Sequence, residues 1–139
     1  MRTIVIVVLL ASCACSRATP RINEPGAPDP LTIDVTEDEW QAAFPAEALH
    51  LPMPRRIAGP KTPGMPDIAS GSTAHAALEI VFRTDGTVGL HRVVAATSES
   101  YARFVVRWLR AQRFAPMTKD GRTIVVRSTY EMEHTKWAQ

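Results

Sequence analysis

Apolar and polar residues alternate from Ala76 to Arg83 with the period of a strand that buries one face. The predicted inward residues are Ala76, Leu78, Ile80 and Phe82. Asp85-Gly86 follows, and Asp-Gly between two β-rich runs favours a hairpin because Gly accepts the positive φ of the turn. Val88 to Ala95 is then the returning strand. Arg92 falls in phase with its apolar residues, which predicts a bulge or an edge position there.

An amphipathic helix is predicted after this hairpin. Its inward residues, at the spacing i, i+3, i+4, i+7 and i+8, are Tyr101, Phe104, Val105, Trp108 and Leu109. Candidate N-caps are Thr97, Ser98 and Ser100. The opposite face carries Arg103, Arg107 and Arg110. Pro116 prevents the helix from continuing.

A third strand is predicted from Thr123 to Glu133, after a turn at Asp120-Gly121. One face of this strand carries Ile124, Val126, Ser128, Tyr130 and Met132. The other face carries Val125, Arg127, Thr129, Glu131 and Glu133. The sequence therefore predicts an α+β fold, a small β-β-α-β domain with one helix packed on a short antiparallel sheet.

Several short motifs in this region resemble the TonB C-terminal domain family. They are Met65-Pro66-Asp67-Ile68-Ala69, Phe82, Asp85-Gly86, Val93-Val94, Gln112-Arg113-Phe114-Ala115-Pro116 and Asp120-Gly121. The most specific is the Arg-Phe-x-Pro helix end followed by Asp-Gly and a β-rich run. The resemblance covers roughly Thr62 to His134, about half of the chain.

The resemblance implies a periplasmic protein-binding module with a link to TonB-dependent transport. In that family the C-terminal strand accepts an extended peptide of an outer-membrane receptor by strand addition. The corresponding residues here run from Arg122 to Glu133, with Arg127, Thr129 and Glu131 facing outward. The alternative interpretation is an edge protected by its charges. A second functional alternative is TonB-type energy transduction, which requires a transmembrane helix and a long linker that the sequence does not indicate.

The sequence of the N-terminal residues predicts a lipoprotein signal peptide over residues 1–12. Met1-Arg2 is a short positive start, and Thr3 to Ala11 is an apolar run far shorter than the ~20 residues of a spanning helix. Leu10-Ala11-Ser12-Cys13 resembles the bacterial lipobox, which implies lipid attachment at Cys13 and anchoring to a membrane of the cell envelope. Ala14 implies the outer membrane. An ordinary cleaved signal, a Cys13-Cys15 disulfide and a metal pair are the alternatives.

Residues 13–61 are predicted to form a Pro-rich tether before a domain at residues 62–139. Within the tether, Leu31 to Val35 is a candidate short strand. Thr36 and Glu39 have the spacing of a capping box, which predicts a short helix to about Phe44 with Trp40 and Phe44 on its inner face. Packing of this helix on the core domain is favoured over folding only against a partner.

Charge is distributed unevenly along the chain. Residues 76–139 contain 10 Lys+Arg and 6 Asp+Glu, a net +4, whereas residues 13–75 contain 5 and 8, a net −3. An acidic tether folding back on a basic module is one consequence. The total of +2 is too small to indicate a nucleic-acid partner. The row Arg103, Arg107 and Arg110 is either a solvated face or a contact for anionic lipid, peptidoglycan or an acidic protein.

No catalytic motif is found in the sequence. The histidines His50, His75, His91 and His134 lack the spacing of metal ligands and are interpreted as surface residues. There is no Gly-x-Ser-x-Gly motif and no phosphate-binding glycine loop. We therefore expect no metal, no cofactor and no enzymatic activity, although a small envelope hydrolase or inhibitor without a recognisable motif is a further alternative.

Overall fold

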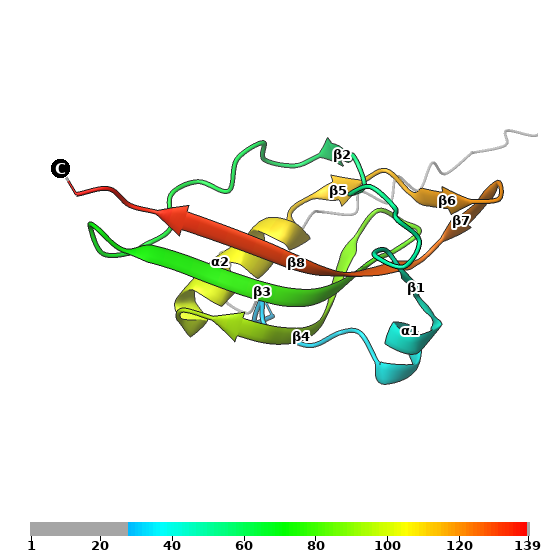
Figure 1. Ribbon diagram of the computed structural model, residues 1–139, viewed down its shortest axis with the longest axis horizontal. Helices are drawn as coiled ribbons and strands as arrows, with labels where there is room; N and C mark the ends of the chain where they lie inside the picture. The colour runs from blue at the N-terminus through cyan, green and yellow to red at the C-terminus, as the bar shows by residue number, and fades with distance from the viewer. Residues whose placement is uncertain (1–27, 139) are drawn as a thin grey trace, which may run out of the picture.

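The computed structural model describes residues 28–138, and a four-stranded sheet with the strand order β1-β8-β3-β4 forms its centre (Figure 1). Helix α2 crosses one face of this sheet. The elements are α1 (Glu37–Ala42), β1 (Phe44–Pro45), β2 (Arg56–Ala58), β3 (Thr73–Phe82), β4 (Val88–Ala96), α2 (Glu99–Arg110), β5 (Arg113–Phe114), β6 (Met117–Lys119), β7 (Arg122–Ile124) and β8 (Val126–Thr135). The predicted signal peptide, Cys13, Cys15 and the first part of the predicted tether lie outside the described residues.

The fold is mixed α+β, as predicted. It contains further strands and a second helix in addition to the elements of the predicted β-β-α-β unit. β1 joins the sheet parallel to β8, whereas β3 pairs antiparallel with both β4 and β8. Two short antiparallel ribbons, β2 with β5 and β6 with β7, lie outside this sheet. The sequence did not predict β2, β5 or β6, because each is only two or three residues long, and β7 was predicted only as the start of the third strand.

The β3–β4 hairpin forms around Asp85-Gly86, as predicted. The Arg83 amide donates to the Thr87 carbonyl at 2.9 Å, and Gly86 has a φ of +83°. The backbone packs tightly here, since a Cβ at Gly86 would lie 2.5 Å from the Phe114 carbonyl oxygen. The pairing shifts register between Glu79 and Ile80, next to Arg92 of β4, so the predicted bulge is confirmed.

Helix α2 is capped by Ser98, the one of the three candidate caps whose hydroxyl accepts the Tyr101 amide, at 3.1 Å. Its buried residues are Tyr101, Ala102, Val105, Val106 and Leu109. Phe104 and Trp108 are only half-buried at the margin of the core. The buried face is therefore rotated toward Ala102 and Val106 relative to the prediction. It packs on Leu78, Ile80 and Leu90 of the hairpin.

The predicted third strand is interrupted at Val125. Arg122–Ile124 pairs with Met117–Lys119 around Asp120 and Gly121, both of which have positive φ, and β8 starts at Val126. In β8 the two faces are as predicted: Val126 and Ser128 are buried, whereas Glu131 and Glu133 are exposed. β8 keeps an unbroken register with β3 over its full length.

The residues before β2 pack against the sheet. Thr36 caps α1 through the Glu39 amide, as the capping box predicted. The helix ends at Ala42, however, so Phe44 lies in β1 and is 39% exposed, contrary to the prediction. Leu31 to Val35 is not a strand, although the amides of Asp34 and Val35 both donate to the Leu90 carbonyl at 3.2 Å.

A second small core lies on the face of the sheet opposite α2. Val35 and Ala43 are buried there against Val81, with Trp40 and Val125 at its margin. Val125, at the break before β8, packs against the margin of this core. The segment around α1 is therefore part of the folded unit.

Candidate functional site

The outer edge of β8 is only partly covered. The Phe44 amide donates to the Val125 carbonyl at 2.9 Å, and the Ala46 amide donates to the Arg127 carbonyl at 3.0 Å. Main-chain groups alternate in direction along a strand, so those of the odd-numbered residues of β8 point away from β3. β1 thus occupies the first outward positions of this edge.

Glu47 closes the next position with its side chain. Its Oε1 accepts the Ser128 hydroxyl at 3.0 Å and the Thr129 amide at 3.3 Å. Burial alone would raise the pKa of Glu47, but hydrogen bonds from its own amide, Ser128 and Thr129 hold this pKa below its ordinary value. The carboxylate takes the place that a main-chain carbonyl would have if the parallel strand continued past β1.

Beyond Thr129 the edge of β8 is open. Within residues 28–138, no main-chain hydrogen bond joins another strand to the outward amide and carbonyl groups of Glu131 and Glu133. The open stretch runs from the Thr129 carbonyl to the end of β8 at Thr135. An uncovered, regular edge of this kind is a template for pairing with another extended chain.

The opposite edge of the sheet, on β4, is blocked in two ways. The β3–β4 register shifts twice, between Ala77 and Leu78 and between Glu79 and Ile80, and bulges disrupt a strand edge. The Leu90 amide donates to Asp34 Oδ1 at 2.8 Å, and its carbonyl accepts two amides of the N-terminal segment. The two edges therefore differ: β4 is irregular and capped, and β8 is regular and open.

The three β8 residues predicted to face a partner lie in different surroundings. Arg127 Nη1 donates to the Trp40 carbonyl at 3.0 Å, and its guanidinium lies 5.2 Å from the Trp40 ring centre. Thr129 is exposed beside the Glu47 cap. Glu131 is exposed, and His75 Nε2 lies 3.9 Å from its carboxylate. Only Thr129 and Glu131 therefore belong to the open edge, because Arg127 anchors α1.

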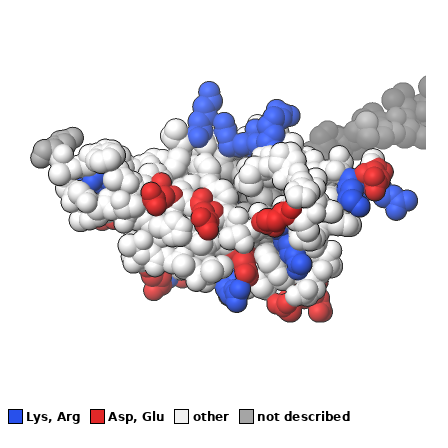
Figure 2. Space-filling model, viewed as in Figure 1, with Lys and Arg blue, Asp and Glu red and all other residues white. Residues whose placement is uncertain are grey.

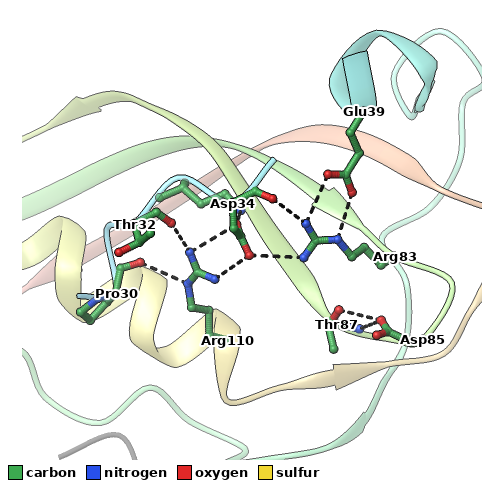
Figure 3. Close-up of polar contacts among 9 residues, drawn as sticks. Pro30, Thr32, Asp34, Glu39, Arg83, Asp85, Thr87 and Arg110 are labelled. Carbon is green, nitrogen blue, oxygen red and sulfur yellow. Dashed lines mark hydrogen bonds and ion pairs between the residues drawn. The ribbon is translucent and has the colours of Figure 1, made fainter. Parts of the chain in front are cut away.

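The arginine row on α2 binds the N-terminal segment. Arg103 pairs with Asp29 at 2.9 Å and with Glu99. Arg110 Nε and Nη2 donate to the carbonyls of Pro30 and Thr32 at 3.1 and 2.6 Å (Figure 3). Arg107 is half-buried, and its Nε has no partner among the described residues. Two of the three predicted contact residues are thus engaged within the chain, and the predicted folding back of the acidic segment is observed for residues 29–39.

Asp34 is the centre of this contact (Figure 3). Its carboxylate pairs with Arg110 at 3.0 Å and with Arg83 at 3.3 Å. Burial would raise the pKa of Asp34, but the Leu90 amide and Arg110 outweigh it and hold the pKa below its ordinary value. Arg83 also pairs with Glu39 at 3.0 Å, and this bond raises the pKa of Arg83. The network joins α1, the hairpin and the end of α2.

His91 is a residue that sequence reasoning misjudged. It was interpreted as a surface residue, but its side chain is 15% exposed and stacks on Trp40 with ring centres 4.4 Å apart. Nδ1 lies 2.9 Å from Glu79, and Nε2 lies 3.0 Å from Glu37. His91 sits at the bulge of β4, so the bulge predicted near Arg92 was the only sequence signal for its position.

A small pocket adjoins the covered part of the edge. It has a volume of about 160 Å³ and is lined mainly by apolar side chains, among them Leu51, Met53, Phe82 and Met117, with Glu47 and Ser128 at its side. A cavity of this size holds a single aromatic or aliphatic group. The lining comes from four separate segments, so no local sequence pattern could have predicted it.

Neither a metal site nor a spanning helix is found in the part of the chain that the structure describes. Residues 28–138 contain no group of three His, Cys, Asp or Glu side chains able to hold a metal ion. None of the helices in this range has the length and apolar character to cross a bilayer. A comparison with protein families finds no match for this chain, and a comparison with curated proteins finds none at a significant level.

Proposed function

We propose that this protein is a lipid-anchored binding protein of the bacterial cell envelope. Its folded part holds another envelope protein by accepting an extended segment of that protein along β8. The open edge from Thr129 to Thr135 is the observation that carries this proposal. Main-chain hydrogen bonds supply the affinity in this mode of binding, and side chains at alternate positions supply the selectivity.

The difference between the two edges of the sheet supports this assignment. Soluble proteins protect exposed strand edges with bulges, short strands, covering segments and charges. The β4 edge carries two register shifts and the Asp34 cap, whereas ten residues of β8 run without a bulge. Glu131 and Glu133 discourage self-association of the open edge while leaving its main-chain groups accessible.

The arrangement of β3, β4, α2 and β8 is the part of the fold that we assign to a TonB C-terminal-like β-β-α-β module. The motif Arg113-Phe114-x-Pro116 forms β5 and the link to β6, and Phe114 packs edge-on against Phe82 with ring centres 5.2 Å apart. This contact explains why the motif has an aromatic residue at position 114. The anchor part of the proposal depends on the resemblance of Leu10-Ala11-Ser12-Cys13 to a lipobox.

Site-specific photocrosslinking in cells tests the binding proposal. A photoreactive amino acid at Glu133 lies on the open edge, and one at Asp120 lies in the β6–β7 turn. We expect a crosslinked envelope protein from position 133 and none from position 120. Glu131→Pro should abolish the crosslink, because it removes an outward amide and places the proline ring on the edge without taking a hydrogen bond from β3.

Glu131→Ala is the matched control for this proline, since it keeps the amide. The loss in Glu131→Pro beyond that in Glu131→Ala measures the contribution of the main chain. Circular dichroism of both variants establishes that the fold is retained. Equal crosslinking from Glu131→Pro and Glu131→Ala would contradict strand addition.

Incorporation of a radioactive fatty acid tests the anchor. We expect label in the wild-type protein and none after Cys13→Ala, while Cys15→Ala should keep it. Label that persists in Cys13→Ala would contradict lipidation at this residue.

A further inference from the structure

We infer that the segment bound at the β8 edge alternates basic and apolar residues, an inference that rests on the proposed function. The site is the open main-chain edge from Thr129 to Thr135, and the side chains beside it determine which sequence fits. Two independent sets of side chains border this edge, one on each face of the sheet. Each set specifies one half of the alternating pattern.

On the face opposite α2, the edge is acidic. Figure 2 shows acidic side chains over β8, whereas basic side chains gather over β2 and the loop that follows it. Glu131 and Glu133 are exposed on this face. Their register partners on β3 are Ala77 and His75. Among residues 28–138, no Lys or Arg forms an ion pair with either carboxylate.

Several carboxylates elsewhere in the folded part already hold an arginine. Asp29, Asp34 and Glu79 each hold an arginine within 3.0 Å. Glu131 and Glu133 differ because their β3 neighbours offer no Lys or Arg, and their other side is the open edge. A strand added there would place its own side chains directly opposite them, at a Cβ separation of roughly 5 Å. Lys or Arg at those positions supplies the missing cations.

On the α2 face, the same edge is apolar. Tyr130 and Met132 are half-buried and pack against the main core. The Tyr130 ring lies 6.5 Å from that of Trp108, and Ile68 packs on the same cluster. The alternate residues of an added strand would cover this margin, and apolar side chains there remove its surface from water.

The chain itself defines where the added segment ends. β1 and the Glu47 carboxylate occupy the edge up to the Thr129 amide. The remaining stretch ends at Thr135, so about 20 Å of edge is available at the usual rise per residue. The expected ligand is therefore a segment of roughly six extended residues with basic side chains at every second position.

Two synthetic peptides test this inference with the full-length protein carrying Cys13→Ser. One is acetyl-Lys-Val-Lys-Val-Lys-Val-amide, and the other has Glu in place of every Lys. Binding is measured by amide chemical shifts and hydrogen exchange of Glu131 and Glu133 in NMR spectra, up to millimolar peptide. We expect the basic peptide to protect these amides and to bind roughly tenfold more tightly than the acidic one, because each cross-strand charge pair changes from repulsive to attractive.

Paired substitutions separate the contribution of the side-chain charges from that of the main-chain hydrogen bonds. Glu131→Gln with Glu133→Gln should remove the preference, and Glu131→Lys with Glu133→Lys should reverse it. A preference that survives the Gln pair, or equal binding of both peptides to the wild-type protein, overturns the charge inference. If both peptides still protect the two amides in that case, strand addition stands. If neither peptide protects them, the proposed function fails as well.

Discussion

Arg110 and Asp34 form an ion pair with Nη1 3.0 Å from Oδ2, although 76 positions separate them in the chain. Arg83 reaches the same carboxylate at 3.3 Å. The three side chains are between 26% and 35% exposed, so water screens these charges less than it screens a fully exposed pair. One carboxylate therefore joins the N-terminal segment to the hairpin and to the end of α2 (Figure 3).

Replacing Asp34 with Asn should lower the free energy of unfolding by about 2 kcal/mol, because the variant loses charge-assisted hydrogen bonds to two arginines and keeps an acceptor for the Leu90 amide. Urea unfolding followed by circular dichroism measures the change. Asp67→Asn is the control, since Asp67 is exposed and forms no ion pair among residues 28–138. A variant at Asp34 as stable as the one at Asp67 would refute the assigned role.

The effect of Asp34→Asn should depend on pH. The folded state lowers the pKa of Asp34, so this group contributes stability above its unfolded pKa, near 3.9, and loses it as the pH falls through the lower folded pKa. The difference in unfolding free energy between wild type and Asp34→Asn should be constant between pH 7 and 5. It should shrink as the pH falls below about 4. Urea titrations across this range test the trend, and a difference that grows with acid would be inconsistent with it.

Gly86→Ala should destabilise the protein by about 3 kcal/mol. An alanine there must adopt a φ near +83°, and its Cβ would lie 2.5 Å from the Phe114 carbonyl oxygen. Gly121→Ala is the matched control, because Gly121 has a φ of +75° with no atom within 4 Å of the added Cβ. That variant should cost only the left-handed backbone penalty of about 1 kcal/mol. Thermal unfolding of both variants isolates the steric part, and equal costs would rule it out.

Ser98→Ala should cost about 1 kcal/mol, because the Ser98 hydroxyl is the acceptor for the Tyr101 amide at the start of α2. Ser100→Ala should change stability by less than about 0.5 kcal/mol, since Ser100 is exposed within the first turn. The comparison is made by urea unfolding. Were Ser100→Ala the more harmful of the two, the assignment of the cap would be incorrect.

Local patterns predicted the elements that local physics determines. The period of apolar residues located α2, and Asp85-Gly86 located the hairpin, because each signal lies within the element that it specifies. The same reasoning separated the inward and outward residues of β8. The bulge near Arg92 was predicted because this charged residue falls in phase with the apolar residues of the strand.

Contacts between distant segments produced the features that the sequence did not predict. Val125, at the break before the last strand, packs against a second core that contains Val35 and Ala43, and neither of these is near Val125 in sequence. His91 contacts Glu37 and Trp40 of α1, and α1 lies far before His91 in the sequence. The charge distribution predicted that the acidic segment folds back, but it did not indicate that the arginines of α2, which were expected to face solvent or a partner, are the residues that bind it.

The second core sets a limit on how far the protein can be shortened. Val81 is fully buried beneath Val35 and Ala43, on the sheet face that α2 does not cover. A fragment beginning at Thr62, where the family resemblance starts, would lose that cover together with β1 and β2. It would expose Val81 and release the whole length of β8 as an edge, so such a fragment should self-associate. Proteolytic trimming from the N-terminus would therefore convert the partly covered edge of β8 into one that self-associates along its whole length.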